Sequence, residues 1–298
     1  MKPPRHSFKA FTEQQISQKE AAGATATAAH YRAALRRLLA FRDGADISLR
    51  AIDAQLIDAF ESHLHRHGLS PNTCSFYLRT LRALYNRAVD LGHTRDSRPF
   101  RHAYTGNAPT PKRALKADAL RRLASADLSD APSLAFARDA FLMSFYLYGM
   151  SFVDMCQLKR SDLRAGYVTY RRRKTGRLMR IAWLPELDTL ASRYPRAPGC
   201  LLPLLPADGG TSYLSVLWRV NRNLRLLGRR LGIDTTLTTY VARHSWATAA
   251  RDTGESIEAI SKCLGHRDTR TTEIYLGALD TSIIDRLGHT VAATISTP

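Results

Sequence analysis

The sequence is poor in several features that mark secreted, membrane or zinc-binding proteins. It has four cysteines in 298 residues, Cys74, Cys156, Cys200 and Cys263, and no two of them form a CxxC pair. This scatter indicates reduced thiols, and neither a disulfide framework nor a zinc site is expected. No apolar stretch approaches the roughly 20 residues of a transmembrane helix, and no apolar signal segment begins the chain. We therefore expect a cytoplasmic protein without membrane contact.

Acidic residues are also scarce. The chain has 26 Asp and Glu against 44 Lys and Arg, a formal net charge of +18. Such a charge attracts polyanions, and nucleic acid is the favoured partner, with an anionic membrane surface as the alternative. The carboxylates are dispersed, which argues against a two-metal nuclease. No glycine-rich phosphate-binding loop occurs either, so neither a metal nor a nucleotide cofactor is expected.

What the sequence does contain begins with helical periodicity over the first hundred residues. Gly44 and Gly68 are typical helix stops, and Ser70 followed by Pro71 is typical of an N-cap and a first helical position. Together with the apolar spacing, these signals predict an all-α module with helices in residues 31–43, 53–67 and 70–91.

The periodicity breaks after residue 95. The segment 96–112 is basic and contains three prolines and a Gly-Asn pair. This composition is typical of an interdomain linker, and its charge favours a path along a phosphate backbone. The chain is therefore divided into a helical domain at 1–95 and a second domain at 113–298.

The second domain mixes helices with a β-hairpin. An apolar helix closes at Gly149, and β-forming residues flank a turn at 174–176. Residues 214–232 form a helical stretch with a dense basic face, and two more helical stretches follow. The fold class is therefore expected to be mainly α with a small β-sheet. The core of this domain is expected to hold the three tryptophans, Trp183, Trp218 and Trp246.

Several residues of the second domain suit phosphodiester chemistry without a metal. The charge of a phosphoryl transition state must then be met by arginine, lysine and histidine, and the nucleophile must be a side chain. Arg243 offers a planar fork for phosphate oxygens, and His266 follows 23 residues later. Tyr275 comes nine residues after His266. Taken alone, it fits a core aromatic as well as a nucleophile activated by nearby cations. Lys174 at the hairpin tip is placed to reach a base edge or a leaving oxygen.

The order of the motifs YVARHSWAT, LGH and TTEIYLG resembles the tyrosine recombinase (phage integrase) family, and more narrowly the integrases and invertases of Bacteroidetes mobile elements. The resemblance covers nearly the whole chain. Residues 1–95 are similar to the family's all-α, SAM-like core-binding domain, and residues 113–298 to its mixed α/β catalytic domain. The resemblance implies a C-clamp around DNA and site-specific recombination, as integration, excision or inversion.

The resemblance also implies roles for individual residues. Tyr275 would be the nucleophile that forms a 3′-phosphotyrosine, and Lys174 would protonate the departing 5′ oxygen. Arg243 would be the second catalytic arginine and His266 the later catalytic histidine. Tyr240 occupies the place of the family's first histidine, where it can donate a hydrogen bond.

One departure from the family pattern is more serious. Ser151 stands where the family has its first catalytic arginine. Loss of one charged donor is expected to slow the reaction by about 100- to 1000-fold unless another cation takes its place. Arg138, on the helix that leads to this turn, is the expected substitute.

The resemblance further implies that the partner is double-stranded DNA carrying recombination sites. Four protomers would assemble on it, with the C-terminal tail docked on a neighbouring protomer, and the need for accessory DNA-bending proteins stays open. No metal site is expected, although His63 and His67 share a helix face. Six arginines are interpreted either as DNA contacts or as ordinary surface charges: Arg79, Arg82, Arg87, Arg173, Arg222 and Arg225.

Two other functions remain open at this stage. The same chemistry would serve a type IB topoisomerase-like enzyme, which nicks and swivels DNA as a monomer. The missing arginine at Ser151 also allows a catalytically weakened protein that only binds DNA.

Overall fold

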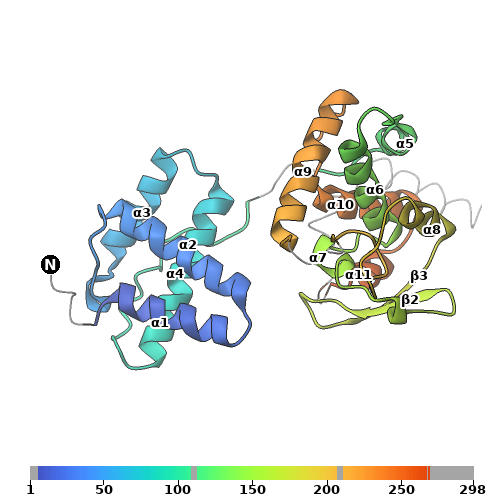
Figure 1. The fold of residues 1–298 in the computed structure, drawn as a ribbon. Helices are drawn as coiled ribbons and strands as arrows, with labels where there is room; N and C mark the ends of the chain where they lie inside the picture. The colour runs from blue at the N-terminus through green and yellow to red at the C-terminus, as the bar shows by residue number, and fades with distance from the viewer. Residues whose placement is uncertain (1–5, 109–112, 207–210, 267, 269–298) are drawn as a thin grey trace, which may run out of the picture. The chain divides into compact units, whose positions relative to one another are not determined.

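The computed structural model describes residues 6–108, 113–206, 211–266 and 268. The chain forms two compact units, Met1–Thr110 and Pro111–Pro298, which are treated separately below (Figure 1). The described residues are mainly α-helical and include one three-stranded sheet in the second unit, which confirms the predicted fold class. None of the described helices combines the length and the apolar character that crossing a membrane requires.

The first unit is all-helical. Its core includes Phe60, Leu64, Leu78, Leu81 and Tyr85, which lie on the apolar stripes of two successive helices. Its elements are α1 (Phe8–Ala21), α2 (Thr25–Phe41), a 3-10 turn η1 (Leu49–Ala51), α3 (Ala54–Arg66) and α4 (Pro71–Asp90).

The helix signals of the first unit act as the sequence indicates. The Ser70 hydroxyl accepts a hydrogen bond from the Thr73 amide, and Pro71 is the first residue of α4. Gly44 and Gly68 both adopt positive φ after the helix ends. Helix α1 was not among the expected helices, and it buries Thr12 and Gln15 beside Phe8 and Phe11.

The segment expected as a linker is largely attached to the first unit. Phe100 is buried in the core of that unit. The Tyr85 hydroxyl donates to the carbonyl of Arg95, and the Ser75 hydroxyl donates to the carbonyl of Gly106. The Asn72 side chain bonds both backbone groups of Ala108. Most of 96–112 therefore packs along α4.

The second unit combines seven helices of the described part with a small sheet. Most of its helices surround α6, whose apolar residues are buried on nearly every side. Its elements are α5 (Ala117–Ser125), α6 (Pro132–Tyr146), α7 (Phe152–Met155), a 3-10 turn η2 (Arg160–Asp162), β1 (Leu163–Arg164), β2 (Tyr167–Arg171), β3 (Leu178–Ala182), α8 (Pro185–Ser192), α9 (Tyr213–Arg230), α10 (Thr239–Asp252) and α11 (Ile257–Leu264).

The hairpin forms at the predicted place. Strands β2 and β3 are antiparallel, with Val168 opposite Ile181 and Arg171 opposite Leu178. Val168 and Ile181 are both buried, because side chains directly opposite each other on paired strands lie on the same face of the sheet. The short strand β1 extends the sheet on the other side of β2. Beyond the paired strands, the Arg172 amide donates to the Arg177 carbonyl and closes the turn.

The expectation that all three tryptophans lie in the core is wrong for Trp218. Its side chain is 62% exposed, whereas Trp183 and Trp246 are half-buried. Helix α9 buries Val216, Val220 and Leu224 on one face, and a residue two positions after Val216 lies about 200° away around the helix. The helical period therefore turns Trp218 towards solvent.

Candidate active site

The site is organised by the turn that ends α11. Gly265 adopts the left-handed conformation, with φ of 64°, and caps the helix. The amide of His266 then bonds back to the carbonyl of Ser261. This geometry turns the carbonyls of Leu264, Gly265 and His266 towards three arginines of the second unit.

Arg243, on α10, lies at the centre of the site. Its side chain is buried, with 4% exposure. Its Nη1 donates to the carbonyl of Gly149 at 2.9 Å. Its Nη2 donates to the carbonyl of Leu264 and lies 2.9 Å from Nε2 of His266. Its Nε has no hydrogen-bond partner among the described residues. A buried guanidinium with a spare donor is suited to an anionic ligand.

Gly149 lets the chain approach Arg243 closely. This residue has φ of 68°, and a Cβ placed on it would lie 2.6 Å from the Cα of Arg243. Glycine is therefore required both by the backbone conformation and by the space. The neighbouring Tyr148 ring stacks on Trp246, one turn beyond Arg243 on α10, with 5.1 Å between the ring centroids.

Two arginines of the hairpin donate to carbonyls of the turn that ends α11. Figure 1 shows this helix beside strands β2 and β3. Arg172 is 7% exposed, and its Nη1 donates to the carbonyl of Gly265 at 2.6 Å. Arg177 donates to the carbonyl of His266. The Thr175 hydroxyl also lies 3.4 Å from the Gly265 carbonyl. The partial negative charge at the C-terminus of a helix is favourable for these cations.

The concentration of positive charge shifts the titration of the site. Burial lowers the pKa of Arg243 to about 10, and the charge of Arg172 adds to this shift. Burial also lowers the pKa of His266 to about 4, with further contributions from Arg243, Arg172 and Lys174. His266 is therefore neutral at pH 7. Because Nε2 faces a guanidinium donor, it accepts that hydrogen bond, and the ring proton lies on Nδ1.

Two other predicted residues lie around this centre. Lys174 is exposed at the hairpin turn, close enough to lower the pKa of His266. Tyr240 lies one turn before Arg243 on α10, and its ring packs edge-on against His244 at 4.9 Å. Burial raises the pKa of the Tyr240 hydroxyl, and the positive charges of Arg243 and Arg172 oppose this increase. The structure thus brings Arg243, His266, Lys174 and Tyr240 to one place.

Ser151, at the position of the missing arginine, borders the same centre. Its hydroxyl donates to Oδ2 of Asp154 at 2.6 Å. The Oδ1 atom of the buried Asp154 accepts a bond from the backbone amide of Arg173 at 2.9 Å. One carboxylate therefore joins the turn after α6 to the hairpin.

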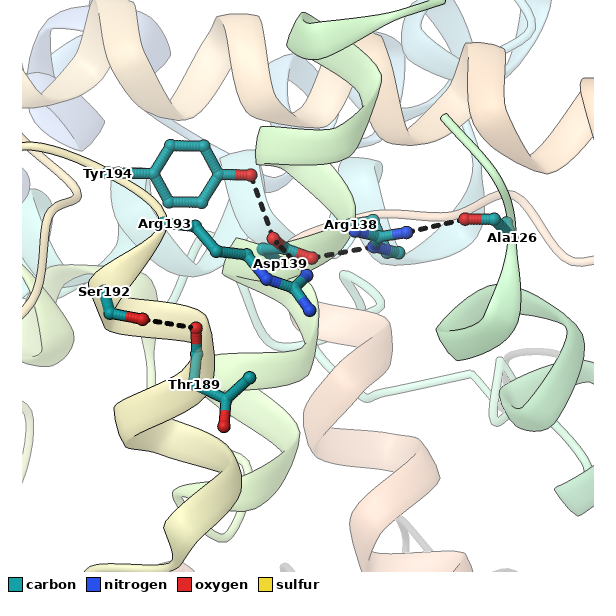
Figure 2. Close-up of polar contacts among 7 residues, drawn as sticks. All are labelled: Ala126, Arg138, Asp139, Thr189, Ser192, Arg193 and Tyr194. Carbon is teal, nitrogen blue, oxygen red and sulfur yellow. Dashed lines mark hydrogen bonds and ion pairs between the residues drawn. The ribbon is translucent and has the colours of Figure 1, made fainter. Parts of the chain in front are cut away.

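Arg138, the expected substitute for the missing arginine, is already engaged elsewhere (Figure 2). Its Nε donates to Oδ1 of the fully buried Asp139 at 2.7 Å, and its Nη1 donates to the carbonyl of Ala126 at 2.7 Å. Arg193 and the Tyr194 hydroxyl bind the other oxygen of Asp139. Arg138 thus belongs to a structural ion pair that ties α6 to the segment after α8, and we no longer place it at Ser151.

The remaining predicted residues are more scattered. Tyr275 lies outside the described residues. In the second unit, Arg173, Arg222 and Arg225 are exposed. In the first unit, Arg87 is exposed, while Arg79 and Arg82 are half-buried and bond Asn107 and Thr105.

Sequence reasoning missed Arg172, Arg177 and Asp154. For Arg172 a signal was present. Val168 and Tyr170 point inward from β2, so the strand period of two places residue 172 on the same side. The run of three arginines at 171–173 obscured it, because charged runs are usually solvated.

The exposed face of α9 combines positive charge with an aromatic ring. This helix has no acidic residue, and Arg219, Arg222, Arg225 and Arg229 are all exposed. The Arg222 guanidinium carbon lies 5.7 Å from the centroid of the Trp218 ring. Such a face is suited to a nucleic-acid backbone and base edges.

Comparison with known proteins relates both units to the same family. Residues 7–103 match the phage integrase SAM-like domain, and residues 218–281 match the phage integrase family domain. The tyrosine recombinase XerC of Pseudomonas aeruginosa is 26% identical, covering 91% of this chain and 89% of the relative. The tyrosine recombinase XerD of Caulobacter vibrioides is 27% identical, covering 89% of this chain and 90% of the relative.

Solved structures show the same fold. A lambda integrase (75–356) dimer bound to a COC′ core site has a TM-score of 0.70 at 16% identity, covering 92% of this chain and 98% of the other. The Tn1549 transposon integrase with transposon right end DNA has a TM-score of 0.69 at 15% identity, covering 96% of this chain and 99% of the other. The two domain matches and the recombinases that are similar over most of their length show that this chain belongs to the tyrosine recombinase (phage integrase) family and is a site-specific DNA recombinase.

Proposed function

We propose that this recombinase cuts and rejoins double-stranded DNA through a covalent bond between Tyr275 and a 3′ phosphate. The observation that carries the proposal is the convergence of Arg243, His266 and Lys174 in one cluster of the second unit. These side chains come from α10, from the turn after α11 and from the hairpin, which are far apart in the sequence. The positive charge of this cluster is suited to an anionic ligand.

The chemical step transfers one phosphoryl group. The Tyr275 oxygen attacks the scissile phosphorus, a phosphorus–oxygen bond to tyrosine forms, and the bond to the 5′ oxygen breaks. Lys174 gives a proton to the departing 5′ oxygen, and the proton of the phenol is released to solvent. His266, which is neutral at pH 7 and carries its hydrogen on Nδ1, can donate that hydrogen to the phosphate. Rejoining is the reverse step. The 5′ hydroxyl of a DNA strand attacks the phosphotyrosine, a new phosphodiester bond forms, and the bond to Tyr275 breaks. The energy of the phosphodiester is kept in the intermediate, so ATP is not required.

The other residues of the cluster hold the phosphate. Arg243 faces the non-bridging oxygens with its free Nε donor and remains charged at pH 7, because its pKa of about 10 lies well above this pH. The Tyr240 hydroxyl replaces the histidine of the family as a hydrogen-bond donor to the same phosphate. We assign core DNA binding to residues 1–95 and catalysis to residues 113–298, with 96–112 between them.

DNA contacts outside the cluster are assigned to six further arginines. Arg173, Arg222 and Arg225 of the second unit are exposed. In the first unit, Arg79, Arg82 and Arg87 lie on α4, where Arg87 is exposed and the other two are half-buried. Solved relatives include a lambda integrase tetramer bound to a Holliday junction. We propose the same assembly for this chain, on paired recombination sites in the cytoplasm.

The C-terminal tail is proposed to dock on a neighbouring protomer of that tetramer. After Tyr275 it carries apolar residues at Ile283, Ile284, Leu287 and Val291, spaced for one face of a helix. A half-open pocket of about 270 Å³ lies between α10 and α11, lined in part by Trp246 and Ile260, and offers an apolar surface for it. Undiminished tetramer formation on DNA by a chain ending at Leu276 would rule out this docking.

A nicked suicide substrate tests the chemistry. Cleavage beside the nick releases a short fragment, so the enzyme stays trapped on the DNA. We expect a covalent adduct with the wild-type chain and none with Tyr275→Phe, while both bind the DNA alike. An adduct that persists in Tyr275→Phe would remove Tyr275 from its role. Joined products between two substrates would exclude a type IB topoisomerase-like swivelase.

A further inference from the structure

The active site lacks one of the positive charges that the family pattern provides. The family pattern places an arginine where this chain has Ser151, and the Ser151 hydroxyl is bonded to the Asp154 carboxylate. A phosphoryl transition state spreads its charge over three equatorial oxygens, which are usually met by more than one cation. Arg138 is held by Asp139 and is not available for this place.

Arg172 lies where such a cation is required. Its guanidinium binds the carbonyl of Gly265, and the guanidinium of Arg243 binds the carbonyl of Leu264, the preceding residue. Consecutive residues are about 3.8 Å apart at their Cα atoms, so the two guanidinium groups bind neighbouring carbonyls, and the charge of Arg172 adds to the lowering of the pKa of Arg243. Tight packing fixes Arg172 there, because a Cβ on Gly265 would lie 3.1 Å from its Cδ.

The backbone ties Arg172 to the position of the missing arginine. Asp154 accepts bonds from the Ser151 hydroxyl and from the amide of Arg173, the residue after Arg172. The carbonyl of Gly149, two residues before Ser151, accepts a bond from Arg243. The turn at 149–151, the end of β2 and helix α10 therefore meet around the same point.

The charge of Arg172 is not neutralised by an ion pair. Among the described residues, no carboxylate forms an ion pair with Arg172 or with Arg243, in contrast to Arg138 and Arg193 on Asp139. The Gly265 carbonyl takes one of the five N–H donors of Arg172. Two buried guanidinium groups side by side repel each other, and an anion placed between them relieves this repulsion.

We propose that Arg172 is a catalytic residue that binds a non-bridging oxygen of the scissile phosphate and replaces the arginine missing at Ser151. The inference rests on the proposed function, since it concerns the same phosphate. Arg172 transfers no proton. It stabilises the negative charge that builds up while the bond to Tyr275 forms and the bond to the 5′ oxygen breaks.

The test compares adduct formation by Arg172→Ala, Arg172→Lys and the double variant Arg172→Ala/Ser151→Arg on the nicked suicide substrate. We expect Arg172→Ala to lower the rate by about 100- to 1000-fold, with DNA binding changed by only a few fold. Arg172→Lys keeps the positive charge but loses the planar fork of the guanidinium. Its rate of adduct formation is therefore expected to lie between those of the wild-type chain and Arg172→Ala. The double variant carries an arginine at the family position, and its rate of adduct formation is expected to be at least about tenfold higher than that of Arg172→Ala.

A second substrate distinguishes a catalytic role from a structural one. A methylphosphonate at the scissile position replaces one non-bridging oxygen by a methyl group and removes the negative charge of the ground state. Loss of a cation that binds this charge then costs less, so the ratio of wild-type to Arg172→Ala rates is expected to shrink by at least about tenfold. A residue that only supports the fold would lose the same factor on both substrates.

Arg180→Ala is the matched control, because Arg180 lies on β3 of the same hairpin, is exposed and stacks 3.6 Å from the Tyr167 ring centroid. It is expected to leave the rate unchanged. Arg172→Ala at the wild-type rate, or an equal loss on both substrates, would overturn the assignment of Arg172. If Arg172→Ala does not fold, the same two substrates are compared with Arg172→Lys. Absence of any adduct with the wild-type chain would instead overturn the proposed function.

Discussion

At the scale of single residues, two glycines decide how closely the chain approaches the cationic centre. Gly149 lies against the backbone of Arg243, and Gly265 lies against Arg172 and Met179. Both have positive φ, so a side chain would meet strain as well as a neighbouring atom. The glycine at Gly149 was read from the sequence as a helix stop, whereas its contact with α10 depends on a residue 94 positions later and could not be seen there.

Gly149→Ala separates strain from close contact. The new Cβ would lie 2.6 Å from the Cα of Arg243, so α10 must shift, and we expect a loss of stability of about 2–4 kcal/mol together with a large loss of adduct formation. Urea unfolding and the suicide substrate measure the two effects.

Gly166→Ala is the matched control for this change. Gly166 has φ of 75°, yet nothing lies within 4 Å of a Cβ placed on it. Gly166→Ala should therefore lower the stability only through the backbone strain of a positive φ, by about 1 kcal/mol, and the variant should keep its activity. Equal losses in the two variants would contradict the role given to the Gly149–Arg243 contact.

At the scale of elements, features that depend on local signals could be predicted, and features that depend on long-range contacts could not. The start of α4 and the hairpin were predicted correctly, because Ser70-Pro71 and the 174–176 turn act over a few residues. Helix α1 was missed because its buried side includes Thr12 and Gln15, which blur the apolar stripe. The buried position of Arg172 was missed because the run of arginines at 171–173 is typical of a solvated segment and because its partner, Gly265, is 93 residues away in the sequence.

Helix α9 is expected to bind DNA through its exposed face. Replacement of Arg222 by alanine should weaken DNA binding. The logarithm of the association constant should also fall less steeply with the logarithm of the salt concentration, with a slope smaller in magnitude by about 1, since one phosphate contact is lost. Replacement of Trp218 by alanine should weaken binding without changing this slope, because the indole carries no charge. Electrophoretic or fluorescence binding assays at several salt concentrations measure both.

The same helix supplies a control for these variants. Arg230 lies on α9, but its guanidinium binds the Asp130 carboxylate at 2.9 and 3.1 Å. Arg230→Ala is therefore expected to change the salt slope less than Arg222→Ala. An unchanged affinity in both Arg222→Ala and Trp218→Ala would show that this face does not contact DNA.

At the scale of the whole molecule, the stability of the second unit should depend on pH. Burial and neighbouring arginines lower the pKa of both His244 and His266 to about 4, from an ordinary value of 6.5. The unfolded chain therefore binds more protons between these values, so the folded state loses stability as the pH falls from about 6.5 to 4. At pH 5 the loss is up to about 2 kcal/mol per histidine.

Tryptophan fluorescence isolates this effect, because Trp183, Trp218 and Trp246 all lie in the second unit. Urea unfolding followed at pH 7.5 and pH 5 should show the loss in the wild-type chain and much less of it in a His244→Gln/His266→Gln double variant. The same pH dependence in both proteins would mean that other groups carry it.

The end of α11 has a consequence for how the positive charges of the site are held together. Its last carbonyls carry partial negative charge and accept hydrogen bonds from the guanidinium groups of Arg172, Arg177 and Arg243. The helix end thus acts as an internal surrogate for phosphate oxygens and holds three like charges close together.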